Sequence, residues 1–279
     1  MISYLTNHCQ PALPSDFLKG EPPSHMIKRG GTLGYGCALA ILLAASLVSN
    51  AQTSINKTFS VQSGQKLSLH FDDPEIKLQT WDKNEVLIKG TVSINHGEND
   101  NAFELQANSS AQELNITSLM KDKENIPQRI ILKKGDTEYF FKAKDFNDPE
   151  VQKFLEQNGR DYSYMSHGIV KEIKLEVFVP KKMETTVRAK YGLVEVKNFD
   201  APLTIEAKYG GVDVTIAAGS IGEITARSRY GEILTNLGIP FNHAQHPDQH
   251  NNWTEISAKP GAGPRYSFES KYGNVYLRK

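Results

Sequence analysis

The chain is organised around one stretch, Val187-Arg188-Ala189-Lys190-Tyr191-Gly192-Leu193-Val194-Glu195-Val196. In this stretch a small residue, a cation, a tyrosine and a glycine follow one another, and a β-branched residue comes two positions after the glycine. The phrase occurs four times, at residues 189–192, 207–210, 228–231 and 270–273. Its tyrosines are 18, 21 and 42 residues apart, and 42 is twice 21. Repetition near this period is typical of short β units that stack on one another.

Within one copy the polarity alternates as it does along a β-strand. Val187, Ala189 and Tyr191 share one side and alternate with charged residues. The parity shifts by one across Gly192, since Val194 is the next apolar residue of the inward set. Glycine adopts backbone angles that are closed to other residues, so each copy predicts a bulge or corner. By parity, we expect the four tyrosines to face inward and pack in the core rather than to form a carbohydrate-stacking surface.

Stacked units would place equivalent residues in columns about 4.8 Å apart. An inward tyrosine such as Tyr209 should then cost about 3 to 5 kcal/mol of stability when replaced by alanine.

The cationic column has two interpretations, either a solvated face that discourages edge pairing or a docking strip for an anionic polymer. Nearby Glu and Asp residues favour the solvated face. The structural repeat positions are Tyr191, Gly192, Tyr209, Gly210, Tyr230, Gly231, Tyr272 and Gly273, and the cations are Lys190, Lys208, Arg229 and Lys271.

The first 51 residues differ in character from the rest. Residues 1–25 are proline-rich without periodicity, and we interpret them as a non-native upstream extension. Residues 26–51 begin with a basic segment, continue with an uncharged apolar run from Cys37 to Val48, and end in small residues. This order is typical of a cleaved signal peptide, and the run is short for a membrane span. We expect cleavage before Gln52 and no transmembrane span afterwards, with an uncleaved anchor as the alternative.

Composition excludes several classes of function. Both cysteines, Cys9 and Cys37, lie in the leader, so the exported chain would lack disulfides, thiol nucleophiles and cysteine metal sites. The 32 basic and 32 acidic residues balance, which gives no support for a nucleic-acid partner. No phosphate-binding loop and no Gly-x-Ser-x-Gly motif is present. We therefore expect no cofactor.

Between the leader and the repeats, the sequence predicts short strands and one insertion. Residues 52–117 alternate in polarity between turn signals and predict an N-terminal β region. Residues 118–168 are less regular, with a hairpin over 128–142 and a short helix opened by Asp148-Pro149 and closed by Asn158-Gly159. Residues 169–279 hold the repeats. The predicted fold is all-β, with N-terminal antiparallel strands running into a C-terminal β-solenoid.

Three segments together resemble a known family. They are the Glu85-Val86-Leu87-Ile88 strand, the Leu175-Glu176-Val177-Phe178-Val179-Pro180 strand that leads into the repeats, and the closing Lys271-Tyr272-Gly273-Asn274-Val275. The chain from about residue 59 to 279 is similar to exported bacterial β-strand-repeat proteins, often labelled adhesin-like. The resemblance implies a β-solenoid and an envelope location, and it supplies no catalytic residues. Residues 118–168 and the His-rich loop depart from the family pattern.

Two further groups of residues could carry chemistry. His243, His246 and His250 share one polar loop and would be the ligands if that loop bound a metal ion. Pro247 breaks the helix that would align them and no cysteine joins them, so a solvated polar loop is the better interpretation. Glu195 and Asp213 occupy equivalent positions one repeat apart. Stacking would bring them near the carboxylate separation of retaining glycosidases.

The sequence therefore predicts a non-enzymatic protein of the periplasm, the outer-membrane surface or the medium. We expect it to act as an adhesin-like binding module or a scaffold, with envelope glycans or another envelope protein as partner. Two alternatives stay open. One is a polysaccharide-active enzyme built on the same repeats, and the other is a metal-responsive envelope sensor that uses the His loop.

Overall fold

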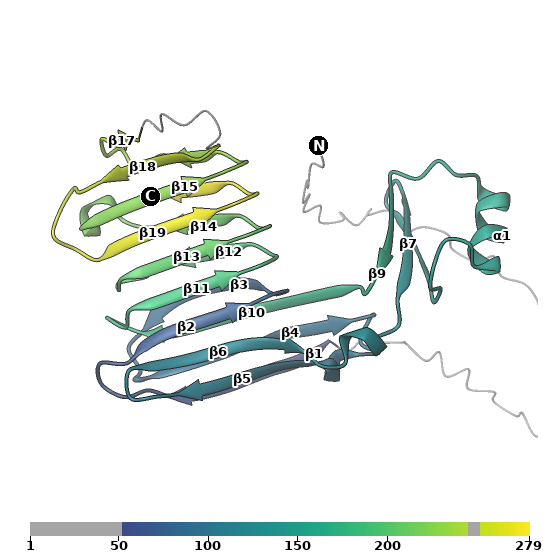
Figure 1. Cartoon of the computed structure of the whole chain (residues 1–279), viewed down its shortest axis with the longest axis horizontal. Coiled ribbons are helices and arrows are strands. Elements are labelled where there is room, and N and C mark those ends of the chain that lie inside the picture. The colour runs from purple at the N-terminus through teal and green to yellow at the C-terminus, as the bar shows by residue number, and fades with distance from the viewer. Residues whose placement is uncertain (1–51, 245–251) are drawn as a thin grey trace, which may run out of the picture. The chain divides into compact units, whose positions relative to one another are not determined.

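The computed structural model describes residues 52–244 and 252–279. These residues form a mostly β protein with three sheets and one short α-helix (Figure 1). The two large sheets mix parallel and antiparallel pairing. The predicted upstream extension and signal peptide, together with His246 and His250, lie outside the described residues.

The first large sheet has eight strands. Its pairing is antiparallel from β1 to β10 and parallel from β10 to β16. In spatial order the strands are β1 (Thr53–Ser60), β4 (Glu85–Ile94), β10 (Lys171–Pro180), β3 (Glu75–Trp81), β12 (Val194–Lys197), β14 (Val212–Thr215), β20 (Val275–Arg278) and β16 (Ile233–Thr235).

The second large sheet has nine strands. Its middle, from β15 to β6, is parallel, and antiparallel strands flank it at both edges. In spatial order the strands are β17 (Asn242–His243), β18 (Thr254–Ala258), β15 (Glu223–Ser228), β19 (Arg265–Ser270), β13 (Leu203–Ala207), β11 (Thr185–Ala189), β2 (Lys66–Phe71), β6 (Glu113–Met120) and β5 (Phe103–Ser109).

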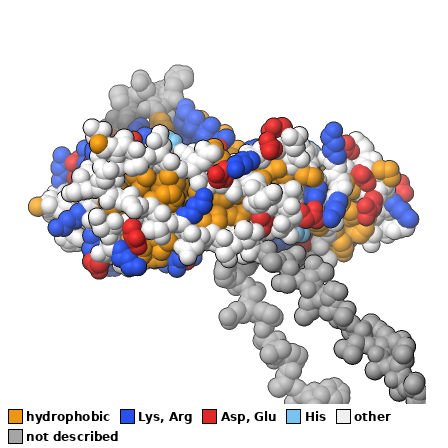
Figure 2. All heavy atoms as spheres, turned by 90° about the horizontal axis from the view of Figure 1, so that it is seen from below, with side chains coloured by type: hydrophobic (Ala, Val, Ile, Leu, Met, Phe, Trp, Pro, Cys, Tyr) orange, Lys and Arg blue, Asp and Glu red, His pale blue; other side chains and the backbone are white. Residues whose placement is uncertain are grey.

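Apolar side chains of both sheets form one core. Burial alternates residue by residue along the repeat strands, as the period-two pattern predicts. Tyr266 on β19 is only 1% exposed, and its hydroxyl donates a hydrogen bond of 2.8 Å to the carbonyl oxygen of Phe199. Strands β1 and β5 are edge strands of the two sheets, and apolar side chains reach the surface beside them (Figure 2). Ile55 and Phe59 of β1 are among the side chains that are partly buried against the core.

Each copy of the phrase joins a strand of the second sheet to a strand of the first, and we call such a pair with its corner a rung. The rungs are β11–β12, β13–β14, β15–β16 and β19–β20. They do not stack in sequence order, because β19–β20 lies between β13–β14 and β15–β16 (Figure 1). After β16 the chain returns through β17 and β18, which pair antiparallel on β15. The 42-residue interval thus contains this return and not an additional parallel rung.

The predicted antiparallel N-terminal strands are present as the pairs β1–β4 and β5–β6, but the predicted boundary between them and the parallel repeats is wrong. Strands β2 and β3 pair in parallel with β11 and β12, so they form a further rung at the start of the series. Its corner, Asp72-Asp73-Pro74, lacks the tyrosine and the glycine. The antiparallel strands β1, β4 and β5 continue the same two sheets beyond this rung.

The corner glycines lie where neighbouring rungs touch through their backbones. A Cβ atom placed on Gly210 would lie 1.6 Å from the carbonyl oxygen of Gly192, and one on Gly273 would lie 2.4 Å from that of Gly210. One on Gly231 would lie 2.3 Å from the carbonyl oxygen of Gly273. Real Cβ atoms do not approach oxygen so closely, so any other residue would push the rungs apart. Gly192 additionally has a φ of +82°, which favours glycine.

The small residue at the start of the phrase lies beneath the same corner. In two copies it is a fully buried serine, and the hydroxyl of Ser270 donates to the carbonyl oxygen of Gly210 at 2.8 Å. The hydroxyl of Ser228 donates to the carbonyl oxygen of Gly273 at 3.1 Å. These bonds tie each corner to the rung beside it.

The segment between β6 and β10 has its own small core. It consists of β8 (Thr137–Phe141), β7 (Arg129–Lys134), β9 (Tyr164–Gly168) and α1 (Pro149–Asn158). The carboxylate of Asp148 accepts a hydrogen bond of 2.9 Å from the Glu150 backbone at the helix start, and Gly159 follows the last turn at a φ of +80°. The predicted hairpin and helix are both confirmed. The remaining helical turns are short 3-10 segments at Asp100–Ala102, Lys123–Asn125 and Ala218–Ser220.

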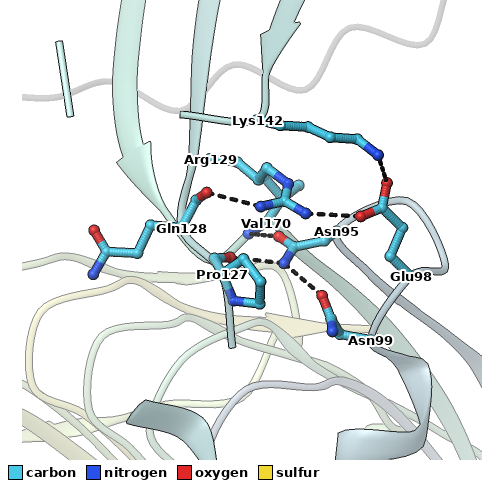
Figure 3. A network of polar contacts seen from close by, with 8 residues as sticks. All are labelled: Asn95, Glu98, Asn99, Pro127, Gln128, Arg129, Lys142 and Val170. Atoms are coloured by element: carbon cyan, nitrogen blue, oxygen red, sulfur yellow. Dashed lines mark hydrogen bonds and ion pairs between the residues drawn. The ribbon is translucent and has the colours of Figure 1, made fainter. Parts of the chain in front are cut away.

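A buried asparagine network joins this segment to the first sheet (Figure 3). The Asn95 side chain is fully buried, and its amide donates at 2.8 Å to both Asn99 and the carbonyl oxygen of Pro127. Its oxygen accepts from the Val170 backbone at 3.2 Å. Nearby, hydrogen bonds from Lys142 and Arg129 hold the pKa of Glu98 below its ordinary value. The Asn95 side chain therefore bonds to both connections between this segment and the large sheets, at Pro127 before β7 and at Val170 after β9.

The glycine contact predicts a large effect of one methyl group. Gly210→Ala should lower the free energy of unfolding by about 3 kcal/mol, because the new Cβ must displace backbone that cannot move aside. Chemical denaturation measures this loss. Gly219→Ala is the matched control, since a Cβ there meets nothing within 4 Å, and it should leave the stability within about 0.5 kcal/mol. Equal stability of the two variants would contradict close backbone contact at the corners.

Candidate functional site

The corners bring the four repeated tyrosines into one exposed stack, which we call the tyrosine ladder. Its spatial order is Tyr191, Tyr209, Tyr272 and Tyr230. Successive ring centroids are 5.1, 5.1 and 5.0 Å apart, with interplanar angles of 12° to 14°. The four residues are 43% to 52% exposed.

The prediction that these tyrosines face inward is therefore wrong. Each strand ends at the small residue, so Tyr191 lies two residues beyond the end of β11, in the corner. Strand alternation does not extend into a corner, and its parity says nothing about the direction of a side chain there. The backbone N–H of Tyr209 donates to the carbonyl oxygen of Lys190 at 2.8 Å, so the rungs remain paired while the ring points outward.

The four predicted cations lie beside the ladder and form what we call the cationic column. Each cation lies within cation–π distance of the tyrosine that follows it in sequence. The charged group lies 5.4 Å from the ring centroid for Lys190, 5.0 Å for Lys208, 5.4 Å for Lys271 and 5.2 Å for Arg229. The arrangement is a two-column strip of phenol groups and positive charges.

The strip is not uniform along its length. At the β2–β3 corner, Asp72 lies 3.8 Å from Lys190, and Asp73 pairs with Lys171, whose ammonium group is 6.0 Å from the Tyr191 ring. Among the described residues, the other three cations of the column have no carboxylate within ion-pair distance. Positive charge is therefore concentrated at Lys208, Lys271 and Arg229.

Two residues before the cations, the outward face of the second sheet carries a second charged column. Arg188 donates to Glu206 at 2.9 Å and to His70 Nε2 at 3.0 Å, so that nitrogen of His70 is an acceptor. Arg227 donates to Glu269 at 3.3 Å. Glu206 and Glu269, which lie beside the strip, are thus each paired with an arginine. A shallow depression of about 310 Å³ lies between the two columns. Its lining includes three cations of the column and three carboxylates, namely Lys190, Lys208, Lys271, Asp72, Glu206 and Glu269.

The ladder determines which aromatic surface a ligand can reach. The faces of the inner rings, Tyr209 and Tyr272, are covered by neighbouring rings on both sides. Their ring edges and hydroxyl groups remain available on the exposed side. A phenol hydroxyl both donates and accepts hydrogen bonds, so the strip offers polar contacts and positive charge rather than flat apolar platforms.

The other candidate residues are not brought together in the same way. His243 is exposed on β17, whereas its two loop partners lie outside the described residues. In the described ranges, no group of three His, Cys, Asp or Glu side chains is arranged to hold a metal ion. Across residues 52–244 and 252–279, no helix has both the length and the apolar character that crossing a membrane requires.

Glu195 and Asp213 are adjacent in register, as their positions in the repeat predict. Asp213 accepts a hydrogen bond of 2.7 Å from Arg278, an interaction that raises the pKa of that guanidinium group. Glu195 lies beside Lys77 on the other side. A depression of about 80 Å³ includes Glu195 but not Asp213. Each carboxylate therefore has a cationic neighbour of its own.

Sequence reasoning missed the first rung and its two aspartates. The phrase is absent there, but one spacing is shared. Ile76 follows Phe71 by five residues, as Val194 follows Ala189. This five-residue interval between inward residues on the two sides of a corner could have identified β2 and β3 as a rung.

Comparison with known proteins gives remote likenesses. No protein-family model and no curated protein matches this chain. A "putative cell adhesion protein" from Clostridium sporogenes has a solved structure that overlaps 82% of this chain and 99% of its own, with 11% identity and a TM-score of 0.43. A "putative adhesin" from Bacteroides fragilis overlaps 82% of this chain and 98% of its own, also at 11% identity, with a TM-score of 0.20.

The exposed ladder predicts a modest role of its tyrosines in stability. Tyr209→Ala should cost about 1 to 2 kcal/mol, because it removes two stacking contacts and leaves no buried cavity. Tyr266→Ala should cost about 3 to 5 kcal/mol, because that side chain is buried and hydrogen-bonded. Chemical denaturation of the two variants in parallel gives both values. If Tyr209→Ala lowered the free energy of unfolding as much as Tyr266→Ala, the result would contradict an exposed ladder and indicate that its tyrosines are buried.

Proposed function

We propose that this chain is a non-enzymatic, adhesin-like protein of the cell envelope that binds an extended surface polymer along the strip. The observation that carries the proposal is the pairing of an exposed four-tyrosine ladder with a parallel cationic column. Exposed aromatic and cationic side chains are characteristic of binding surfaces.

A repetitive surface suits a repetitive ligand. Equivalent groups recur at each rung, so a polymer whose own groups recur can meet several of them at once. Weak contacts then add within one bound chain, since each later contact is made at high effective concentration. Monomeric ligands lack this advantage, which favours a polymer of the cell surface as the partner.

The envelope location rests on the sequence pattern of residues 26–51. The parallel rungs would act as neighbouring turns of a β-solenoid, although not in sequence order, and so hold the backbone beneath the strip rigid. A rigid backbone beneath the strip needs no ordering when a polymer binds, so the conformational entropy lost on the protein side is mainly that of the lysine and arginine side chains.

Binding through the strip predicts a charge-dependent retention. The purified chain should retain envelope polymers from a cell-surface fraction or a glycan array. Lys208→Glu with Arg229→Glu should abolish that retention, because it reverses two of the three column cations that have no carboxylate partner among the described residues. A matched control is Lys133→Glu with Lys153→Glu, two exposed lysines of the β7–β9 segment, which should bind normally. If the variant with the two reversed charges still retained the polymers, binding would lie elsewhere on the protein. If the unaltered chain retained none of them, a purely structural role would be favoured.

A further inference from the structure

We infer that the strip takes a linear acidic polysaccharide, with regularly spaced carboxylates, laid along the axis of the ladder. This inference rests on the proposed function and names the chemical class of its ligand. It is carried by the distribution of unpaired charge, the covered ring faces and the depression beside the strip.

The first step concerns charge. Lys208, Lys271 and Arg229 stand on consecutive rungs, where the adjoining tyrosine rings are 5.1 and 5.0 Å apart. Among the described residues they lack carboxylate partners, whereas Lys190 at the end of the column has Asp72. A row of cations at constant intervals complements a row of anions at constant intervals, so the ligand is a regular polyanion.

The second step concerns the aromatic surface. Single-stranded nucleic acids bind by stacking bases on open aromatic faces, and the inner faces of this ladder are covered by neighbouring rings. The exposed edges carry hydroxyl groups, which pair with a hydroxyl-rich ligand. Sugar residues supply such hydroxyl groups at every unit of the chain.

The third step concerns charge density. Glu206 and Glu269 lie on the outward face beside the strip and are paired with Arg188 and Arg227. A polyanion of much denser charge, such as polyphosphate, would hold several negative charges against these two carboxylates and be repelled. The carboxylates of an acidic polysaccharide can lie over the charged groups of Lys208, Lys271 and Arg229, while its hydroxyl groups meet the tyrosines and the depression of about 310 Å³ that Glu206 and Glu269 also line.

The experiment measures binding of the full chain to polygalacturonate, with dextran as the neutral polymer and single-stranded DNA and polyphosphate as other polyanions. Polygalacturonate should bind most tightly, and binding should weaken with added salt. A hexasaccharide of the same acid should bind more tightly than a disaccharide, because it spans more rungs.

Two variants with the same change of charge locate the site. Lys271→Gln should weaken polygalacturonate binding about tenfold, since a charge-assisted contact is lost at the centre of the unpaired cations. Lys190→Gln should change it less than about threefold, because Asp72 already engages that ammonium group. Unchanged thermal unfolding of both variants excludes misfolding as the cause.

The outcomes separate this inference from the proposed function. Binding of dextran in preference to polygalacturonate, lost in Tyr209→Ala and Tyr272→Ala, would keep a polymer-binding strip and overturn the acidic ligand. Preference for DNA or polyphosphate would also overturn it. Equal losses in Lys190→Gln and Lys271→Gln would contradict the assignment to the unpaired cations, and binding of none of these polymers would overturn the inference outright.

Discussion

Contact between glycine backbones at the corners is the constraint on which the rest of the structure depends. Gly192, Gly210, Gly273 and Gly231 follow one another so closely that a side chain on any of them would strike the neighbouring backbone. Close approach there keeps the backbone hydrogen bonds continuous from strand through corner, as between Lys208 and Ala189 at 2.9 Å. The corners therefore stay in register, and so do the two sheets that they connect.

The candidate site is a direct product of this register. The residue before each glycine leaves the strand pattern and points outward, and identical side chains at that position must stack because the rungs are close. The cations that precede the tyrosines form a column for the same reason. A single short phrase thus specifies both the corner that holds the sheets and the surface that we propose binds a polymer. Charge then differentiates the strip, since Asp72 and Asp73 neutralise one end only.

Local pattern predicted the local structure well and the long-range structure poorly. Alternation located the repeat strands, and Asp148-Pro149 located α1. The direction of the tyrosines was missed because alternation ends at the corner. The rung order was missed because any copy of the phrase can pair with any other, and only the return through β17 and β18 puts β19–β20 between its neighbours. The repetition alone predicted the column of cations. The ion pair between Lys190 and Asp72 could not be predicted in this way, because Asp72 belongs to a rung that lacks the phrase.

The central claim is that the ladder is exposed and is the surface that the polymer covers. Hydroxyl-radical footprinting of tyrosine oxidation, with and without polygalacturonate, tests both halves at once. The account predicts that Tyr209, Tyr272 and Tyr230 react readily in the free chain and are protected in the complex, while Tyr164 of β9 stays reactive and Tyr266 stays inert in both. Ladder tyrosines as unreactive as Tyr266 in the free chain, or fully reactive in a chain shown to hold polymer, would contradict it.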